Sequence, residues 1–489
     1  MLDTVSEYPL LASLGALIGV LGFHSALTNP TRRLHLVRIP FKSTVIDGDI
    51  RLERRSRLTV RQGTLSRALA YYKCASHIIA NRYAGGRKAR KGALNEVIAR
   101  IHAVRFDPRS AYLISGDHFN VLYPRNLGVF YHAVLDDRTA LDEQDWEHRQ
   151  RIYLQTVAFA LDAFSKRGDC STTIVPIGLG AVSCVDIYRY PSDALYGILF
   201  ALTMLIDNSP IAIRYPFMSE TRRPLATREA ARQLIVEHSR ALAALLKRYR
   251  ATVYDEQVGL VRRDRSFSGA KDASLRESAF YDNVIFWCVC SMARALGIAG
   301  ADDIDTASLK ARIIDAFWDP QAGIFREDLT EGGPRFSGDW LCAIFTGFLD
   351  ARDGRERDMI EGNVSFAERH GLAHPFPLRY QEQSGGSRPL IIRLAAAEYG
   401  GMTIWSFWGA EHIKALLLLE RYGGDTAWGA QARRHIAAYE SRIERFRGYP
   451  EVYDAAGEIL RTPFYKSVRQ TGWVVGFEQA QLMAREAKG

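Results

Sequence analysis

The sequence predicts an all-α fold in which helical hairpins close into one large ring, an (α/α)6 toroid. Apolar residues recur with a period near 3.6 along most of the chain, as amphipathic helices require. About twelve segments show this period, and six hairpins need that number. The 489 residues, 47% hydrophobic and 24% charged, have the composition of an ordinary globular protein. Because repeated hairpins can grow past the usual size of a single core, this length fits one domain.

The predicted helices follow one another from Thr64 to the C-terminus, and glycine and proline mark the loops between them. Their approximate ranges are 64–83, 126–137, 146–165, 191–207, 226–249, 276–297, 306–318, 339–351, 356–370, 401–422, 427–446 and 470–486, with a shorter extra helix at 91–104. Loops gathered at one end of such a ring are the expected place for a functional site.

Two short segments precede the toroid, which is expected to occupy residues 64–489. Residues 31–63 alternate apolar and charged positions and predict a small cap of two or three strands, with Asp47-Gly48 as a turn. Residues 1–30 predict an apolar helix, since 8–30 contain no Asp, Glu, Lys or Arg. This helix is just long enough to span a bilayer, and the basic residues after it would place the rest of the chain in the cytoplasm. The alternatives are a membrane anchor at residues 8–30 and a helix docked on the toroid.

Composition and spacing argue against several classes of protein. The formal net charge is +9, but the basic residues are spread along the chain and no zinc-finger, RRM or helix-turn-helix pattern occurs, so we expect no nucleic-acid partner. No Walker loop and no strand–GxGxxG–helix unit is present. The six cysteines include no CxxC pair and show no metal-ligand spacing. The sequence therefore predicts reduced cysteines, no metal and no cofactor.

The stretch from Ser268 to Trp287 combines charges with aromatic residues in a way that a plain core helix does not. Asp272 and Arg276 are four residues apart and would share one face of a helical turn. A carboxyl group on a loop that enters a helix beside aromatic residues is a good general acid, because burial raises its pKa and keeps it protonated near neutral pH. The alternative for this pair is a solvated ion pair at the start of a helix.

A second stretch, Gly448–Ala480, complements the first. Here Glu451 precedes a Tyr-Asp pair, and a Gly-Trp pair opens the last predicted helix. Together the two stretches resemble the six-hairpin glycosidases, which include trehalases, glucosidases of glycoside hydrolase family 63 and the glucosidase part of glycogen debranching enzymes. The SGxDxSxR motif of that group is matched by Ser268, Gly269, Asp272, Ser274 and Arg276, with one extra residue before the Asp. The ExYDxxxG motif and the following GW pair are matched by Glu451, Tyr453, Asp454, Gly457, Gly472 and Trp473.

This resemblance implies an inverting glycoside hydrolase that needs no metal and acts on the end of a glucoside or a related short glycoside. Asp272 would be the general acid and Glu451 the general base, with their carboxyl groups ~6.5–9.5 Å apart. Arg276 would hold a substrate hydroxyl. The reduced cysteines and the basic residues after the N-terminal segment predict a cytoplasmic protein, with tethering to the inner face of the membrane through that segment as an option.

Further substrate-binding residues are expected on the loops between the helices. Tyr123, Arg125 and Asn126 match the aromatic-x-Arg-Asp motif with which debranching enzymes and glucoamylases grip sugar hydroxyls. Asn126 stands where that motif has Asp, so Asp117 is a candidate to supply the missing carboxylate. The other candidates are two residues near a predicted helix start and three tryptophans that offer apolar faces to sugar rings: Tyr190, Asp193, Trp340, Trp405 and Trp473. For the cleft, Trp405 is preferred over Trp408.

Two other function classes remain open. One is a sugar-binding or scaffold protein on the same toroid that has lost activity. The other is an (α/α)6 lyase or epimerase, which would use a histidine for proton transfer, with His118 as the best candidate.

Overall fold

In the computed structural model, the described residues are 41–46, 49–54, 57–85, 91–106, 113, 115–116, 121–130, 142–178, 180–186, 190–206, 225–271, 275–332, 335–383 and 396–486. Three of the predicted site residues, Asp117, His118 and Asp272, lie outside these ranges. The predicted N-terminal helix at residues 1–30 lies outside them as well.

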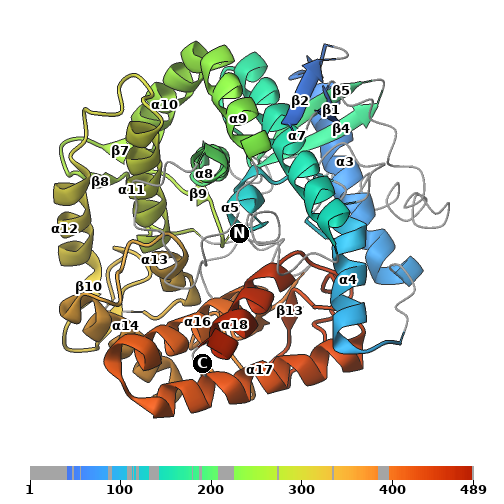
Figure 1. Ribbon diagram of the computed structural model, residues 1–489. Helices are drawn as coiled ribbons and strands as arrows, with labels where there is room; N and C mark the ends of the chain where they lie inside the picture. The colour runs from blue at the N-terminus through green and yellow to red at the C-terminus, as the bar shows by residue number, and fades with distance from the viewer. Residues whose placement is uncertain are drawn as a thin grey trace, which may run out of the picture.

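An inner ring of helices surrounds the middle of the molecule (Figure 1). Within the described residues its members are α5 (Leu127–Phe130), α8 (Ala194–Ile206), α11 (Phe280–Ala295), α13 (Cys342–Phe345), α16 (Ser406–Gly423) and α18 (Val474–Glu486). Each helix packs against the next in this order, and α18 packs against α5. These contacts close the ring.

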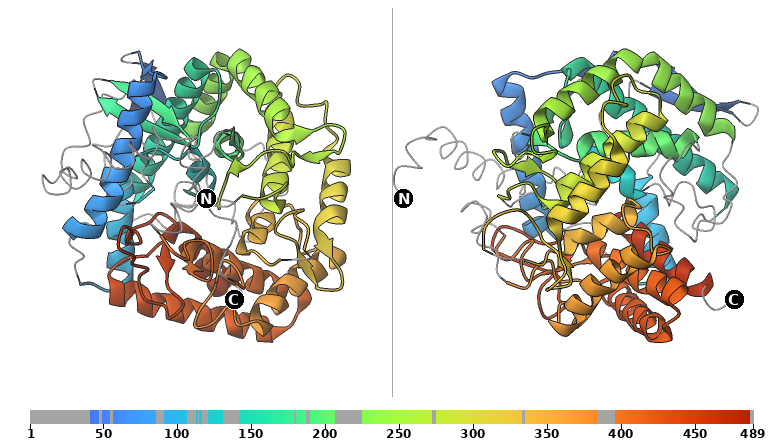
Figure 2. Two further views of the ribbon diagram at one scale, coloured as in Figure 1. Left: turned by 180° about the vertical axis from the view of Figure 1, so that it is seen from behind. Right: turned by 90° about the vertical axis from the view of Figure 1, so that its left-hand side faces the viewer.

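An outer layer alternates with the inner ring along the chain. Its helices, as far as the structure describes the chain, are α4 (Leu94–Arg105), α7 (Glu143–Arg167), α9 (Leu225–Glu237) with α10 (Ser239–Val253), α12 (Thr306–Phe317), α14 (Gly354–Arg369) and α17 (Thr426–Phe446). The outer layer also returns on itself, because α17 packs against α4 (Figure 2). The chain thus forms the predicted all-α (α/α)6 toroid.

The sequences of the two layers explain their places. Helix α8 reads ALYGILFALTMLI, carries no charged residue and is buried on all sides. Helix α12 is amphipathic and buries only Leu309, Ile313 and Phe317, which are four residues apart and share one face. A helix with apolar residues all round has to be surrounded, whereas one with a single apolar stripe has to lie at the edge.

The predicted helices differ from those observed in four respects. The segment 64–83 forms α3 (Thr64–Ala80) and a π-helical turn (Asn81–Gly85), but it precedes the hairpins, and the supposed extra helix 91–104 is the first outer helix, α4. The segment 226–249 forms two helices, α9 and α10, which His238 separates. The segment 339–351 shortens to a 3-10 turn (Gly338–Leu341) followed by α13.

The fourth difference concerns the stretch with the first motif. Helix α11 begins at Phe280, because Ser278 has a left-handed φ of 49° and Ala279 an extended conformation. Arg276 therefore lies in a loop, and the expectation that it shares a helical face with Asp272 is wrong.

The N-terminal cap is a hairpin of β1 (Phe41–Ile46) and β2 (Asp49–Arg54), in which Ile46 pairs with Asp49. The predicted turn at Asp47-Gly48 lies outside the described residues. The hairpin packs on α7 and α9, and Arg54 bonds to Asp162 of α7 at 2.9 Å. The cap is therefore attached to the toroid.

Short sheets connect the helices elsewhere. A three-stranded sheet, which the sequence did not indicate, consists of β3 (Thr59–Val60), β5 (Ala181–Val185) and β4 (Thr173–Gly178). The two-stranded sheets pair β6 (Tyr190–Pro191) with β9 (Phe267–Ser268), β7 (Tyr254–Asp255) with β8 (Leu260–Val261), β10 (Trp318–Asp319) with β11 (Ile324–Phe325), and β12 (Ile404–Trp405) with β13 (Val452–Tyr453). Among the described residues, no helix is both long and apolar enough for a membrane crossing.

Candidate active site

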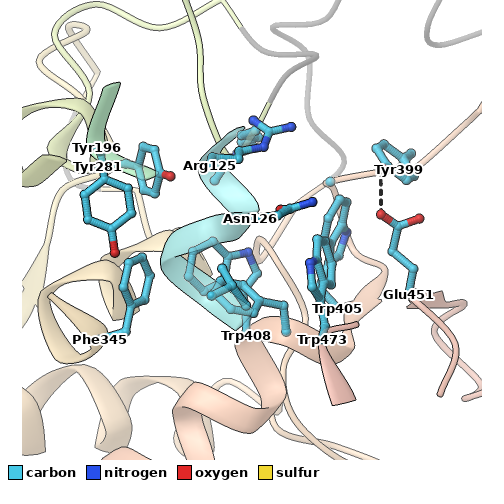
Figure 3. Close-up of a pocket in the computed structure, with 15 residues that line it drawn as sticks. Arg125, Asn126, Tyr196, Tyr281, Phe345, Tyr399, Trp405, Trp408, Glu451 and Trp473 are labelled. Atoms are coloured by element: carbon cyan, nitrogen blue, oxygen red, sulfur yellow. Dashed lines mark hydrogen bonds between the residues drawn. The ribbon is translucent and has the colours of Figure 1, made fainter. Parts of the chain in front are cut away.

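A pocket of about 720 Å³ opens where the inner helices meet the loops that lead into them. Each inner helix contributes at least one lining residue from its own sequence or from the residue just before it. The lining residues are Arg125, Asn126, Val129, Tyr196, Ala270, Lys271, Tyr281, Phe345, Tyr399, Gly400, Trp405, Phe407, Trp408, Glu451 and Trp473. Tyr196, Tyr281 and Phe345 lie at one end and Glu451 at the other, with Arg125 and Asn126 between them (Figure 3).

An aromatic wall stands beside Glu451. The rings of Trp405 and Trp473 stack with centroids 5.6 Å apart, and Tyr399 meets Trp405 edge-on at 4.7 Å. Trp408 also lines the pocket, so the preference for Trp405 alone is corrected. Indole faces of this kind suit the apolar C–H faces of a sugar ring.

Three hydrogen bonds fix the backbone of Glu451. Its N–H donates to the carbonyl of Val468 at 2.9 Å. Its carbonyl accepts hydrogen bonds from the N–H and the hydroxyl of Ser406, both at 3.1 Å. Because β12 pairs Trp405 with Val452, these contacts place Glu451 at the start of α16 and next to the aromatic wall.

Two tyrosines hold the side chain of Glu451. The hydroxyl of Tyr465 donates to Oε2 at 2.9 Å, and that of Tyr399 donates to Oε1 at 3.5 Å (Figure 3). Glu451 is 8% exposed, so its carboxylate reaches the pocket but is otherwise covered. Burial and the neighbouring Glu451 raise the pKa of Tyr465 well above its usual value. The phenol therefore stays protonated as a donor.

The rest of the second motif builds the turn behind Glu451. Oδ1 of Asp454 accepts the N–H groups of Ala456 and Glu458, each at 2.9 Å. Gly457 has a φ of 82°, a conformation that favours glycine. Asp454 and Gly457 thus shape the chain, and of residues 451–457 Glu451 alone is among the described lining residues.

Arg125 and Asn126 form the middle of the pocket. Nη1 of Arg125 donates to the carbonyl of Gly269 at 2.5 Å and lies 3.4 Å from Oδ2 of Asp193. The same carboxylate accepts the hydroxyl of Tyr281 at 3.0 Å. Asp193 is fully buried and is not among the described lining residues, so it positions Arg125 and Tyr281 instead of touching a ligand itself.

The first motif reaches the pocket through Ala270 and Lys271, and Asp272 is the next residue in the sequence. Lys271 is buried and forms an ion pair with Glu327, which also accepts Nε2 of Gln381 at 2.6 Å. Burial lowers the pKa of Lys271 to about 8.

Arg276 is placed differently from the expectation. It is buried beside Asp339, with 2.5 Å between Nη1 and Oδ2, and lies outside the described lining. The predicted hydroxyl contact of Arg276 is therefore corrected, because its guanidinium serves a buried ion pair.

Three other predicted substrate contacts are also absent from the described lining. Trp340 belongs to the hydrophobic core. The ring of Tyr190 lies under the guanidinium of Arg265, and the ring of Tyr123 lies under that of Arg125. Tyr123 therefore supports a lining residue, while Tyr190 and Trp340 are structural.

Several lining or supporting residues were missed in the sequence. Lys271 and Tyr281 lie inside the first motif stretch, so their position was a usable signal. Tyr196 and Phe345 had no such signal, because only the packing of the inner helices brings them to the pocket. Tyr465 lies inside the second stretch, Gly448–Ala480, but its contact with Glu451 depends on how the chain folds back after Glu451.

In sequence, the chain matches no family model and no curated protein. Its fold does resemble solved structures. The GH63 mannosylglycerate hydrolase from Thermus thermophilus shares 11% identity over 80% of this chain and 100% of that chain, with a TM-score of 0.49. A rhamnosidase from Klebsiella oxytoca shares 14% identity over 81% of this chain and 66% of its own, with a TM-score of 0.47. A cellobiose 2-epimerase from Bacillus thermoamylovorans shares 12% identity over 79% and 98%, also at 0.47. The function of this chain therefore has to be inferred from the residues of its own pocket.

Proposed function

We propose that this protein is a glycoside hydrolase that cleaves a glycosidic bond with inversion. The observation that carries the proposal is the carboxylate of Glu451, which two tyrosines hold at the wall of a pocket lined by Trp405, Trp408 and Trp473. An oriented carboxylate beside aromatic faces is what a general base needs to act on a bound sugar.

In the proposed reaction Asp272, protonated, gives its proton to the glycosidic oxygen as the bond to the anomeric carbon breaks. Glu451, ionised, takes a proton from a water molecule whose oxygen forms the new bond on the opposite face of the sugar. The position of Lys271 in the lining supports Asp272 as the acid, because Asp272 follows it directly in the chain. Arg125 and Asn126, between the two ends of the pocket, would bind sugar hydroxyls.

The shape of the pocket favours a short substrate. Tyr196, Tyr281 and Phe345 line the end away from Glu451, which supports action on the end of a glycoside. A lyase or epimerase would use His118, which lies outside the described residues, so the described lining does not weigh for or against that alternative.

The proposal is tested with the full chain and a panel of short α- and β-glycosides, in which released sugar and the first-formed anomer are followed by NMR. Asp272→Asn and Glu451→Gln should each lower turnover by ~10²–10⁴-fold while substrate still binds. Glu458→Gln is the matched control, because Glu458 follows in the same segment and pairs with Arg445 at 2.7 Å outside the pocket. Its activity should equal that of the wild type.

Two results would contradict the proposal. Wild-type protein that binds glycosides without turnover on any of the panel would favour the sugar-binding alternative. Near-normal hydrolysis by both Asp272→Asn and Glu451→Gln would exclude them as acid and base.

A further inference from the structure

Three side chains that commonly bind metal ions meet on the outer wall of the toroid, away from the pocket. They are Glu368 on α14, His412 on α16 and His435 on α17. The three helices lie together in the orange part of the ring (Figure 1), and α16 packs against both α14 and α17. Because the residues are far apart in the sequence, no motif spacing predicted this cluster.

The separations within the cluster are close to those of ligands around one ion. Nε2 of His412 lies 3.1 Å from Oε1 of Glu368, and Nε2 of His435 lies 3.7 Å from the same oxygen. One potential ligand atom from each residue lies within 4.8 Å of the other two. Two ligands ~2.1 Å from a tetrahedral Zn²⁺ are ~3.4 Å apart, so only small shifts are needed to bind it.

A second observation concerns Nε2 of His435, which lies within ion-pair distance of Glu368 but forms no hydrogen bond among the described residues. Its Nε2 is buried and has no hydrogen-bond partner within the part of the chain that the structure describes. A separation of 3.7 Å from Glu368 is too long for a hydrogen bond. A buried imidazole nitrogen that faces a carboxylate without bonding to it is satisfied if an ion sits between them.

We propose that Glu368, His412 and His435 bind one Zn²⁺ ion, with water as the remaining ligand. Two imidazoles and one carboxylate form a ligand set that suits zinc, whereas Ca²⁺ and Mg²⁺ prefer sites built from oxygen atoms alone. The side chains of His435 and Glu368 are 12% and 28% exposed, which gives the ion a path from solvent. His412, fully buried, closes the site from within.

The ion would stabilise the toroid and take no part in the chemistry of the pocket. None of its three ligands is among the described lining residues. It would link one inner helix to two outer helices, and that inner helix, α16, begins at Ser406, which holds the backbone of Glu451. A ligand that binds the folded state and not the unfolded chain raises stability by mass action.

The test uses the full chain after treatment with a chelator. Zinc is titrated by calorimetry, bound zinc is measured by elemental analysis after dialysis, and melting temperature is recorded with and without zinc. MgCl₂ in place of ZnCl₂ is the ion control. His435→Gln and Glu368→Gln are the test variants, because both side chains are partly exposed and their replacement should leave the fold intact. His370→Gln is the matched control, an exposed histidine at the end of α14 that stacks on Phe366.

The wild type and His370→Gln should bind one zinc per chain and melt a few degrees higher with zinc than without it. Both test variants should lose at least ~10-fold in zinc affinity and the thermal shift with it, since each removes a direct ligand. A smaller loss in either variant, or no zinc on the wild type, would overturn the proposal. Circular dichroism of each variant without zinc separates lost binding from lost folding.

Discussion

Tyr465 donates a 2.9 Å hydrogen bond to Oε2 of Glu451 from a position 14 residues further along the chain. The segment between them turns at Asp454 and Gly457 and runs back, so that Glu451 bonds to Val468. The phenol is thereby packed behind the carboxylate and turns it toward the pocket. In the proposed reaction, Tyr465 is a positioning residue for the general base.

Tyr465→Phe should lower kcat by ~10-fold with little change in KM, since a hydrogen bond to a charged group is worth ~1.5–3 kcal/mol and part of that is recovered by water. Tyr399→Phe is the comparison, because its hydroxyl lies 3.5 Å from Glu451 and should contribute less. The measurement is steady-state kinetics on the substrate that the glycoside panel identifies. If kcat falls equally in the two variants, the shorter hydrogen bond of Tyr465 does not contribute more than the longer one of Tyr399.

The place of Glu451 in the pocket was predictable from the sequence, because its neighbours in sequence build the turn that carries it. Tyr465 was not, because its contact depends on how residues 451–468 fold back as a whole. The same limit applies to Asp193, which was expected near a helix start as a contact for the sugar. A local pattern gave no sign that Arg125 and Tyr281 would converge on its carboxylate.

The fold, too, could be predicted only in part from the sequence. Apolar periodicity predicted most of the described helices, since each layer needs apolar faces at fixed intervals. It did not reveal that α3 precedes the alternating inner and outer helices, or that an outer helix is interrupted at His238. Both features depend on the tertiary packing of the helices. The left-handed conformation of Ser278, which delays the start of α11, has no signal in residue type either.

Asp282, in the first turn of α11, predicts a dependence of stability on pH. Burial raises the pKa of its carboxyl from 3.8 to about 6, although Arg276 and the hydroxyl of Ser192 favour the charged form. Between these values the folded state binds more protons than the unfolded chain, so stability falls as pH rises through that window. Above about pH 6 the full cost is present, ~3 kcal/mol for such a change in pKa.

Asp282→Asn removes this cost and keeps an oxygen that accepts the hydroxyl of Ser192, now 2.6 Å from Oδ1. The melting temperature of the variant minus that of the wild type should therefore grow from pH 4 to pH 7 and then level off. Asp264→Asn is the control, because the hydrogen bond from Arg262 lowers the pKa of the exposed Asp264 and gives the opposite sign. If the difference in melting temperature between Asp282→Asn and the wild type does not change from pH 4 to pH 7, ionisation of Asp282 does not destabilise the folded state.

Arg125→Ala should weaken substrate binding more than it slows the reaction. The guanidinium lines the pocket and is held by the Gly269 carbonyl and Asp193, so it is already oriented before a ligand arrives. Loss of a charged hydrogen bond to a sugar hydroxyl should raise KM by ~10–100-fold. Arg265→Ala, which removes a cation over Tyr190 outside the described lining, is the control. A variant in which kcat falls and KM does not would assign Arg125 to the transition state instead.

Gly197 links the packing of the inner ring to the site. A Cβ atom at this position of α8 would lie 2.0 Å from the carbonyl oxygen of Pro124 and 2.8 Å from Cα of Arg125. Both are backbone atoms of the turn that presents Arg125 and Asn126 to the pocket, so the turn would have to move by ~1.5 Å to reach ordinary contact distance.

Gly197→Ala should therefore cost ~1–3 kcal/mol of stability through overpacking. It should also lower kcat/KM by ~10²-fold, because a displacement of about 1 Å in a binding group is enough for such a loss. Gly423→Ala is the matched control, since its nearest neighbour is the side chain of Arg357 at 3.8 Å and the helical position tolerates alanine. Thermal melting and kinetics of the two variants measured together decide the matter. If Gly197→Ala melts and turns over like Gly423→Ala, the turn adapts to α8, and the close approach of the two backbones is not what positions Arg125.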